Sequence, residues 1–266
     1  MKNPFKRKKS PSGTDSRFGN GPQSDDDVLI RPMRGRHELS IAPTAVLVLS
    51  PLDLRQFLRE VAPEADVTKR YDPYFGLWEG IYNDTPFAVA GPALGAPQAV
   101  MVLEKLIALG ARKILFFGWC GSLQPDLHIG HFVLPTETMP EEGTSGHYPI
   151  WPDEPKPSSA LVKIIENTLA ANGGRVRQGK VWTTDAPYRE TVEKVSRYVD
   201  QNVLAVEMEA SALLTVAVFR GVEAAGLLVV SDELSSLKWK HGFRDPVFKE
   251  AAVTGFRSIA EVASII

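Results

Sequence analysis

The sequence predicts a single α/β domain with a mixed central β-sheet flanked by helices on both faces. The chain has 266 residues, of which 44% are apolar, and this is enough to bury a sizeable core. From Thr44 onward, short continuous apolar runs alternate with longer segments of helical periodicity. Gly, Pro, Asn and Asp separate these segments, as they separate strands and helices that pack in layers. We therefore expect residues 41–266 to form one domain.

Residues 1–40 differ in composition and are expected to form a disordered polar tail. Lys and Arg dominate positions 2–9, and Ser, Gly, Pro and Asp dominate from there to Asp27. The basic start lacks the apolar core of a secretion signal. Arg220 and Glu223 interrupt the apolar run of residues 210–230, which is therefore not a membrane span. We expect a cytoplasmic protein that has no membrane partner.

Charge and metal-binding residue types exclude several function classes. The net charge is −2, which gives no general attraction to nucleic acid. Cys120 is the only cysteine, so an intrachain disulfide and a thiolate metal cluster are both impossible. The five histidines are scattered without ligand spacing, and no dinucleotide or P-loop fingerprint occurs. The expected ligand is a small molecule, with no metal and no cofactor.

The first half of the domain is predicted to contain four strands and two helices. Asn83 and Asp84 form a turn between two of the strands, and Gly110 ends the second helix. In chain order the expected elements are strand Ala45–Leu49, helix Leu52–Val61, strands Trp78–Tyr82 and Pro86–Ala90, helix Pro97–Leu109 and strand Ile114–Phe117.

The second half is predicted to alternate in the same way. Ser158 caps a helix that Gly173 ends, and the polar segment 140–157, which contains His147, is a long loop that we expect to close over a bound ligand. The expected elements are strand Phe132–Leu134, helix Ser158–Asn172, strands Arg175–Trp182 and Val203–Val206, helix Ala210–Phe219, strand Leu227–Val230 and a last helix from Asp245.

Two carboxylates stand where the Val203–Val206 strand gives way to an apolar helix. Glu207 and Glu209 flank Met208 at this junction. Ligands collect at the ends of strands in open α/β sheets, so the triplet is a candidate sugar-binding edge. The alternative is structural: both acids complement the positive end of the helix dipole, and Met208 packs in the core.

Three stretches, in this order along the chain, carry a family resemblance. They are Gly91–Pro97, the segment from Gly110–Leu123 through Gly130–Pro135, and Val206–Ala212 (VEMEASA) followed by Val229–Asp232. They resemble the nucleoside phosphorylase family, which includes purine nucleoside phosphorylases, uridine phosphorylases and methylthioadenosine nucleosidases. The resemblance implies cleavage of a nucleoside N-glycosidic bond, with transfer of the ribosyl group to phosphate or water. It also implies a homo-oligomer, either a dimer or a trimer of dimers.

The resemblance assigns two acids to catalysis. Glu209 would hydrogen-bond the ribose hydroxyls and favour the positive charge of an oxocarbenium-like state, with Met208 under the sugar and Glu207 nearby. Asp232 would give a proton to the leaving base. Because an acid at this position is typical of the purine-acting members, a purine is favoured and uridine remains possible. The structural alternative is that Ser231 or Asp232 only caps a helical turn.

The remaining substrate contacts come from two further stretches. Residues 183–190 resemble the family's base-pocket loop, in which Tyr188 would stack on the base and Arg189 would donate to a base carbonyl. A packed Tyr188 and a solvated Arg189 are the alternative. The glycine turn Gly118–Ser122 would bring Trp119 and Gly121 to the substrate.

The phosphate site departs from the family pattern. Where phosphorylases place an Arg and a Ser or Thr, this chain has Phe116 and Trp119, which cannot form charge-assisted hydrogen bonds. Arg55 is a weak candidate for binding phosphate, and Lys69 or Arg70 of a neighbouring subunit is another. We therefore expect a shallow dependence on phosphate as co-substrate, or its replacement by water that Asp53 would activate.

The weakened phosphate site leaves a second function class open. A non-catalytic nucleoside-binding or sensing protein could keep the fold and lose turnover. Such a protein has no need of an acid for the leaving base, so the presence of both Glu209 and Asp232 favours an enzyme.

Overall fold

The computed structural model describes residues 28–61, 68–71, 75–151 and 153–266, and for residues 68–71 it describes the backbone alone. The chain falls into two units, Met1–Arg31 and Pro32–Ile266, and the second contains all of the helices and strands that are described. The expectation of a disordered tail concerns mainly residues 1–27, which lie outside the described ranges. The domain boundary at residue 41 stays a prediction.

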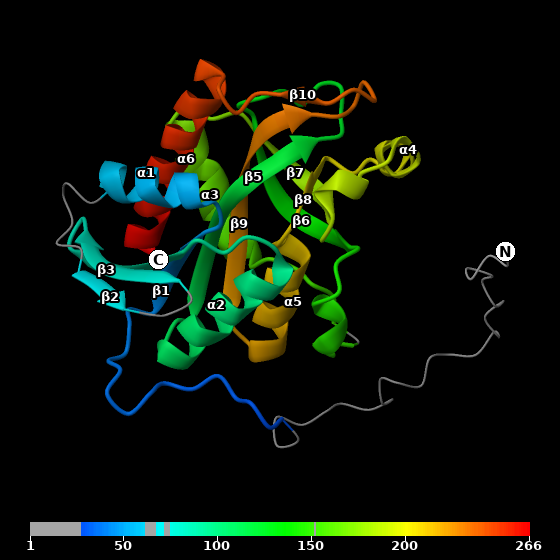
Figure 1. The fold of residues 1–266 in the computed structure, drawn as a ribbon. Coiled ribbons are helices and arrows are strands. Elements are labelled where there is room, and N and C mark those ends of the chain that lie inside the picture. Colours follow the sequence, from blue (N-terminus) through cyan, green and yellow to red (C-terminus); the bar gives the residue numbers. More distant parts are fainter. Residues whose placement is uncertain (1–27, 62–67, 72–74, 152) are drawn as a thin grey trace, which may run out of the picture. The chain divides into compact units, whose positions relative to one another are not determined.

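The strands of the described residues form one mixed sheet (Figure 1). Its order is β10-β9-β6-β7-β8-β5-β1-β4-β3-β2. The bounds are β1 Thr44–Val48, β2 Thr68–Tyr71, β3 Gly76–Tyr82, β4 Thr85–Gly91, β5 Lys113–Ser122, β6 Phe132–Pro140, β7 Val176–Thr183, β8 Ala205–Glu207, β9 Glu223–Glu233 and β10 Lys240–His241.

Five of these strands form a closed ring of hydrogen-bonded neighbours. Strand β9 pairs with β6 on one side and with β5 on the other, and β6, β7, β8 and β5 are joined in that order. The parallel pair β5–β9 and the parallel neighbour β1 all point their carboxyl ends the same way. The three strand ends therefore meet at one edge of the sheet, where ligands bind in folds of this kind.

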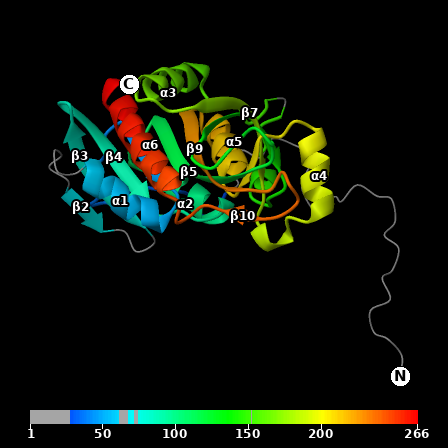
Figure 2. The same cartoon turned by 90° about the horizontal axis from the view of Figure 1, so that it is seen from above.

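Helices cover both faces of the sheet. Helices α1, α6 and α3 pack together on one face (Figure 2), and α2 packs on α5. The ring of Phe117 on β5 lies 5.0 Å from that of Phe256 on α6, so the side chain of the preceding residue, Phe116, points to the opposite face. The bounds are α1 Pro51–Val61, α2 Ala96–Leu109, α3 Ser159–Ala171, α4 Val192–Asp200, α5 Ala210–Arg220 and α6 Pro246–Ile265.

This architecture confirms the predicted fold class, and several local predictions are confirmed with it. Asn83 and Asp84 both have positive φ, 48° and 58°, as a tight hairpin between twisted strands requires. Gly110 ends α2 with a φ of 124°, and the Ser158 hydroxyl accepts the Leu161 N–H at the start of α3. No helix of the described residues is long and apolar enough to cross a bilayer.

The expected glycine turn at Gly118–Ser122 is wrong, because β5 continues through it. The glycines permit close packing within the strand rather than a reversal of the chain. A Cβ on Gly118 would lie 2.7 Å from Leu49 Cδ1, and one on Gly121 would lie 2.8 Å from Leu234 Cδ1. A bulge between Cys120 and Gly121 then shifts the register against β9. Strand β5 therefore stays extended through Ser122, and its last residues reach the edge where the strand ends meet.

Two strands and one α-helix were not expected from the sequence: β2, β10 and α4. Helix α4 begins at the cap Thr191, whose hydroxyl accepts the Lys194 N–H, and buries Val195 and Tyr198. The two-residue strand β10 pairs with the end of β9, with Lys240 opposite Glu233. This pairing folds the segment after β9 back toward the site.

The loop 140–157 is held against α5 by hydrogen bonds. The buried carboxylate of Glu142 accepts the Ser145 N–H at 3.0 Å and the Ser211 hydroxyl of α5 at 2.9 Å. No described residue of this loop, His147 included, lines the main pocket, and closure over a ligand stays a prediction.

Candidate active site

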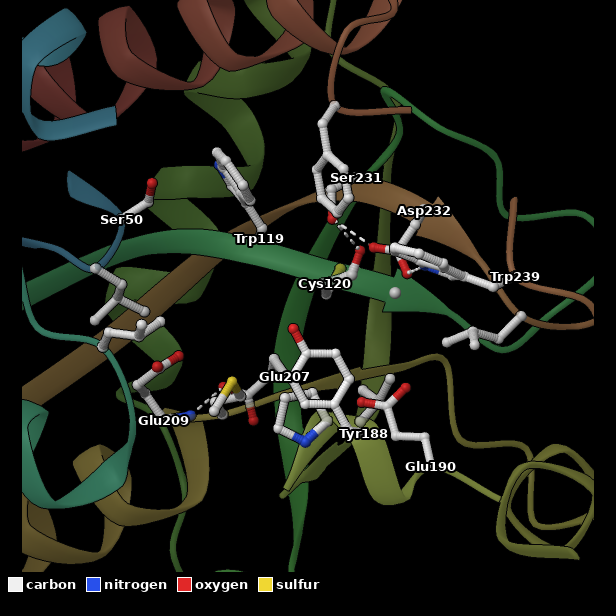
Figure 3. Close-up of a pocket in the computed structure, with 18 residues that line it drawn as sticks. Ser50, Trp119, Cys120, Tyr188, Glu190, Glu207, Glu209, Ser231, Asp232 and Trp239 are labelled. Atoms are coloured by element: carbon white, nitrogen blue, oxygen red, sulfur yellow. Dashed lines mark hydrogen bonds between the residues drawn. The ribbon is translucent and has the colours of Figure 1, made fainter. Parts of the chain in front are cut away.

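A pocket of about 540 Å³ opens at the edge where β1, β5 and β9 end (Figure 3). This volume lies within the roughly 300–1,000 Å³ typical of small-molecule sites. Its lining combines acids and aromatic rings: Leu49, Ser50, Leu94, Trp119, Cys120, Gly121, Pro187, Tyr188, Glu190, Val206, Glu207, Met208, Glu209, Ser231, Asp232, Leu234, Trp239 and Phe243.

The two acids of the triplet have different surroundings. Glu207 is buried, and its carboxylate accepts the Thr183 hydroxyl and the backbone N–H groups of Glu209 (2.7 Å) and Ala210 (2.6 Å). It therefore occupies the amino end of α5, as the structural alternative supposed. Glu209 has one Oε accepting the Gly95 N–H at 2.5 Å, and it lines the pocket beside Met208. Burial raises the pKa of Glu209, and the charge of Glu207 raises it further.

Asp232 faces the pocket across from Glu209 (Figure 3). Its Oδ1 accepts the Ser231 hydroxyl at 2.6 Å, and its Oδ2 accepts the indole N–H of Trp239 at 2.9 Å. The sequence reasoning missed Trp239, which β10 brings back beside the end of β9. Phe243, further along the same segment, lies 5.6 Å from the Trp119 ring and completes an aromatic wall.

The loop after β7 presents different residues from those expected. Tyr188 lines the pocket mouth with 99% of its surface exposed, whereas Arg189 is exposed and does not line the pocket. Glu190 takes the place that the sequence reasoning gave to Arg189. Burial raises the pKa of Glu190 to about 7, and the charge of Asp232 contributes to the rise. Glu190 could have been considered as a candidate from the sequence, because it is a carboxylate at the end of the loop that was expected to contact the base.

Two residues considered for the phosphate site, Phe116 and Arg55, do not line the pocket. Phe116 is fully buried and does not line the pocket; a Cβ on its strand neighbour Gly226 would lie 1.9 Å from its ring. Arg55 is exposed on α1 and is also absent from the lining. Trp119 and Gly121 do line the pocket. The side chains of Lys69 and Arg70 lie outside those described.

Asp53 is buried beside Trp119, not exposed at the surface. Burial raises its pKa to about 7, and the indole of Trp119 offsets part of the rise. No hydrogen bond of normal geometry forms between the two, so Asp53 Oδ2 and Trp119 Nε1 are both left without one. A buried donor and acceptor in this condition provide a place for an ordered water.

The pocket contains four carboxyl groups, and no Lys, Arg or His is among its described lining residues. A phosphate dianion in such a site has no positively charged partner among the described lining residues. In the part of the chain that the structure describes, no group of three or more His, Cys, Asp or Glu side chains is arranged to hold a metal ion. The arrangement can hydrogen-bond hydroxyl and N–H donors, stack on a flat ring and exchange protons near neutral pH.

Two relatives are similar to this chain in sequence. A guanosine phosphorylase of Halorubrum lacusprofundi is 31% identical over 176 residues, covering 64% of this chain and 71% of the relative. A DeoD-type purine nucleoside phosphorylase of Caldanaerobacter subterraneus subsp. tengcongensis is 29% identical, covering 75% of this chain and 87% of the relative.

Two solved structures share the fold. A purine nucleoside phosphorylase of Toxoplasma gondii in complex with immucillin-H has a TM-score of 0.76 at 18% identity, covering 85% of this chain and 91% of that one. A uridine phosphorylase of Vibrio fischeri has a TM-score of 0.73 at 21% identity, covering 85% and 94%. A family model, described as the phosphorylase superfamily, matches residues 43–263, and the chain therefore belongs to that superfamily.

Proposed function

We propose that this protein cleaves the N-glycosidic bond of a purine nucleoside. The observation that carries the proposal is the pairing of Glu209 and Asp232 across one pocket, because they suit the two ends of a nucleoside. Membership of the phosphorylase superfamily and the names of the relatives, which include purine nucleoside and guanosine phosphorylases, support the same reaction.

Glu209 is proposed to bind the ribose. One of its oxygens accepts the Gly95 N–H, which fixes the carboxylate and leaves the other oxygen to accept from the 2′ and 3′ hydroxyls. Met208 lies beside it as an apolar surface for the sugar ring. Hydroxyl donors and the positive charge that develops at C1′ both favour the ionised form of Glu209. The ligand therefore lowers the pKa that burial raises, and the charge is present when the bond breaks.

The base is proposed to lie between Asp232 and Glu190, with Tyr188 at the mouth. Asp232 is proposed as the group that protonates a leaving purine. Glu190 accepts hydrogen bonds from N–H groups on the base edge, which guanine offers side by side. The exposure of Arg189 weakens the interpretation that an arginine donates to a base carbonyl, whether of uracil or of a 6-oxopurine.

The acceptor is proposed to be water, with phosphate as the alternative that the relatives' names support. Trp119 occupies the acceptor side of the pocket, and no described lining residue carries a positive charge. Asp53, whose pKa burial raises to about 7, lies beside Trp119 and is absent from the pocket lining, so as a base it would need a bridging water to reach the acceptor. The family's use of phosphate is the reason to test both.

A homo-oligomer is proposed as well. Apolar side chains are exposed at the pocket mouth, including Leu94 (62%) and Tyr188. A second copy of the chain would cover such surface. Light scattering at micromolar protein concentration should report at least a dimer, and a monomer would contradict this part of the proposal.

Base release from a panel of purine and pyrimidine nucleosides, measured with and without phosphate, tests the function. We expect release from purines, and a fall of at least about 100-fold in Asp232→Asn, since loss of a general acid typically costs 10²–10⁴. Asp200→Asn, which removes an acid at the exposed end of α4, is the matched control and should match the parent. Binding of nucleosides without any release would instead establish the non-catalytic binding protein.

A further inference from the structure

Glu142 is a buried carboxylate that the proposed reaction does not use. It lies just after β6 and is not among the residues that line the pocket. Its Oε2 accepts the N–H groups of Thr144 at 2.5 Å and Ser145 at 3.0 Å, and its Oε1 accepts the hydroxyl groups of Ser145 and, at 2.9 Å, of Ser211. These described donors are all neutral, so the cost of burying the acid is offset by hydrogen bonds to both oxygens. Of these contacts, the one with Ser211 leaves the loop and reaches α5.

Ser211 connects Glu142 to the end of β7. Its hydroxyl group donates to Glu142, and its backbone N–H donates to the hydroxyl oxygen of Thr183 at 3.0 Å. Ser211 and Thr183 are both fully buried, so bulk water does not replace either contact. A hydroxyl group that accepts one hydrogen bond still has its own proton to donate. The proton of Thr183 is directed to Glu207, whose Oε1 accepts it.

Glu207 completes the connection to the residue that is proposed to bind ribose (Figure 3). Its Oε2 accepts the backbone N–H groups of Glu209 at 2.7 Å and Ala210 at 2.6 Å. One oxygen of a carboxyl group accepts hydrogen bonds whether or not the other carries a proton, so this contact does not require Glu207 to be charged. The backbone of Glu209 is thereby fixed, and its side chain accepts the Gly95 N–H. A continuous chain of hydrogen bonds therefore joins Glu142 to Glu209.

We propose that Glu142 is a positioning residue for Glu209, and that it acts through the hydrogen-bond chain that joins them. The proposal rests on the proposed function, since it concerns how the same site reaches its active geometry. A buried polar network whose members are all satisfied is rigid, and the loss of one member affects the others. A displacement of about 1 Å at a reacting centre can cost roughly 100-fold in rate, so a residue outside the pocket can control turnover in this way.

The loop has anchors other than Glu142, so a substitution there should not release it. The Glu141 N–H donates to the Thr183 carbonyl at 2.9 Å, and the Gly143 N–H donates to Asp185 Oδ2 at 2.9 Å. Glu142→Gln keeps one acceptor oxygen and replaces the other with an NH₂ group. At least one pair of the donors that now reach Glu142 therefore loses its acceptor, while the backbone on either side stays in place.

Amide NMR spectra of the full chain test the positioning without turnover. The amide protons of Glu209 and Ala210 donate to Glu207, and their chemical shifts report the lengths of these hydrogen bonds. Both shifts should move in Glu142→Gln. The matched control is Glu137→Gln, the same change at an exposed position of β6, and it should leave both shifts unchanged. Shift changes confined to residues 141–148 would show that Glu142 only holds its own loop, and would overturn the inference.

Base release from guanosine gives the second readout. In Glu142→Gln, kcat should fall at least about 10-fold with little change in KM, because the position of Glu209 matters most in the transition state. Glu137→Gln should keep the parental kcat. Ser211→Ala removes a single hydroxyl group and should also lower kcat. The double variant should lose little more than either single variant, because both changes break the same link.

The outcomes separate the inference from the proposed function. A parental kcat in Glu142→Gln, or additive losses in the double variant, would overturn the inference and leave the proposed function intact. A parent that releases no base would contradict the proposed function instead, and the amide shifts of Glu209 and Ala210 would still decide whether Glu142 positions them.

Discussion

Replacing Glu209 with Gln removes one charge from the proposed ribose site and little else. The side chain keeps its length, and its remaining oxygen can still accept the Gly95 N–H. Its amide group can still hydrogen-bond a ribose hydroxyl. Substrate binding should therefore change little, and the loss should appear in kcat because the charge is needed most when C1′ is positive.

The size of the loss follows from electrostatics. Two unit charges about 4 Å apart interact by about 4 kcal/mol at an effective dielectric constant of about 20. The oxocarbenium-like state carries less than a full charge, so about 3 kcal/mol is a reasonable expectation, which corresponds to roughly a 100-fold fall in kcat. Loss of a comparable electrostatic group in other enzymes has effects of the same order.

Whereas Glu209→Gln should lower activity, it should make thermal stability less sensitive to rising pH. Burial raises the pKa of Glu209, so the folded state binds this proton more tightly than the unfolded state does. Its contribution to stability is full below the ordinary carboxyl pKa and is lost as pH rises through the raised value. Glu209→Gln has no proton to lose, so its melting temperature should fall less than the parent's between pH 5 and pH 9.

The assay is base release under saturating nucleoside, together with thermal melts at the two pH values. Glu193→Gln is the control for both measurements, since this acid is exposed and outside the pocket. A variant that turns over at the parental rate would refute the assignment of Glu209 to the ribose. A variant whose melting temperature falls as steeply as the parent's would refute the account of its burial.

Three further outcomes follow from the same contacts. Base release should persist without added phosphate or need millimolar concentrations, because an uncompensated buried ion is unfavourable by several kcal/mol; strict dependence with micromolar saturation would contradict this. Gly226→Ala should destabilise the fold by about 1–3 kcal/mol, since the new Cβ would lie 1.9 Å from a buried ring of β5, whereas Gly146→Ala, with nothing within 4 Å, should not; equal melting temperatures would argue against the packing. In urea, Glu104→Gln should cost about 3 kcal/mol, because it removes the buried negative charge that faces the arginine of α5 at 2.8 Å. Glu60→Gln, in an exposed pair, should cost less than about 1 kcal/mol, and similar costs for the two variants would count against the burial argument.

The fold class could be predicted from the sequence because it depends on local patterns. Apolar runs, capping residues and turn residues lie within a few positions of one another, as at Asn83-Asp84 and Ser158. The convergence of Glu209 and Asp232 was not accessible in the same way, because β8 runs antiparallel to β5 whereas β9 runs parallel to it, and the register of these strands brings the two acids to one pocket. Their roles stay predictions until turnover is measured.

Two errors had a signal that the reasoning did not use. Phe116 and Trp119 are three residues apart on one strand, so alternation places them on opposite faces and they cannot both line one pocket. Arg55 follows the buried Leu54 on α1, whose inner face continues at Phe57, so the helical period directs Arg55 to solvent.

Two of the remaining errors had no local signal. Trp239 reaches Asp232 because β10 pairs with β9, and a two-residue strand leaves no detectable alternation in the sequence. Glu190 depends on where the loop after β7 turns, which the packing of α4 decides. Asp53 is different: it lies four residues before the buried Phe57 on α1, so the helical period that directs Arg55 to solvent places Asp53 on the inner face.

The amide of Gly95 donates to a side chain 114 residues away rather than to a helix turn or a neighbouring strand. Its hydrogen exchange with solvent therefore depends on the position of one carboxylate, and not on the unfolding of a secondary-structure element. A ligand that favours the ionised form of Glu209 makes that carboxylate a stronger acceptor and should slow exchange at Gly95. This single amide is consequently a reporter of ribose-site occupancy that requires no turnover and can be read for any ligand, cleavable or not.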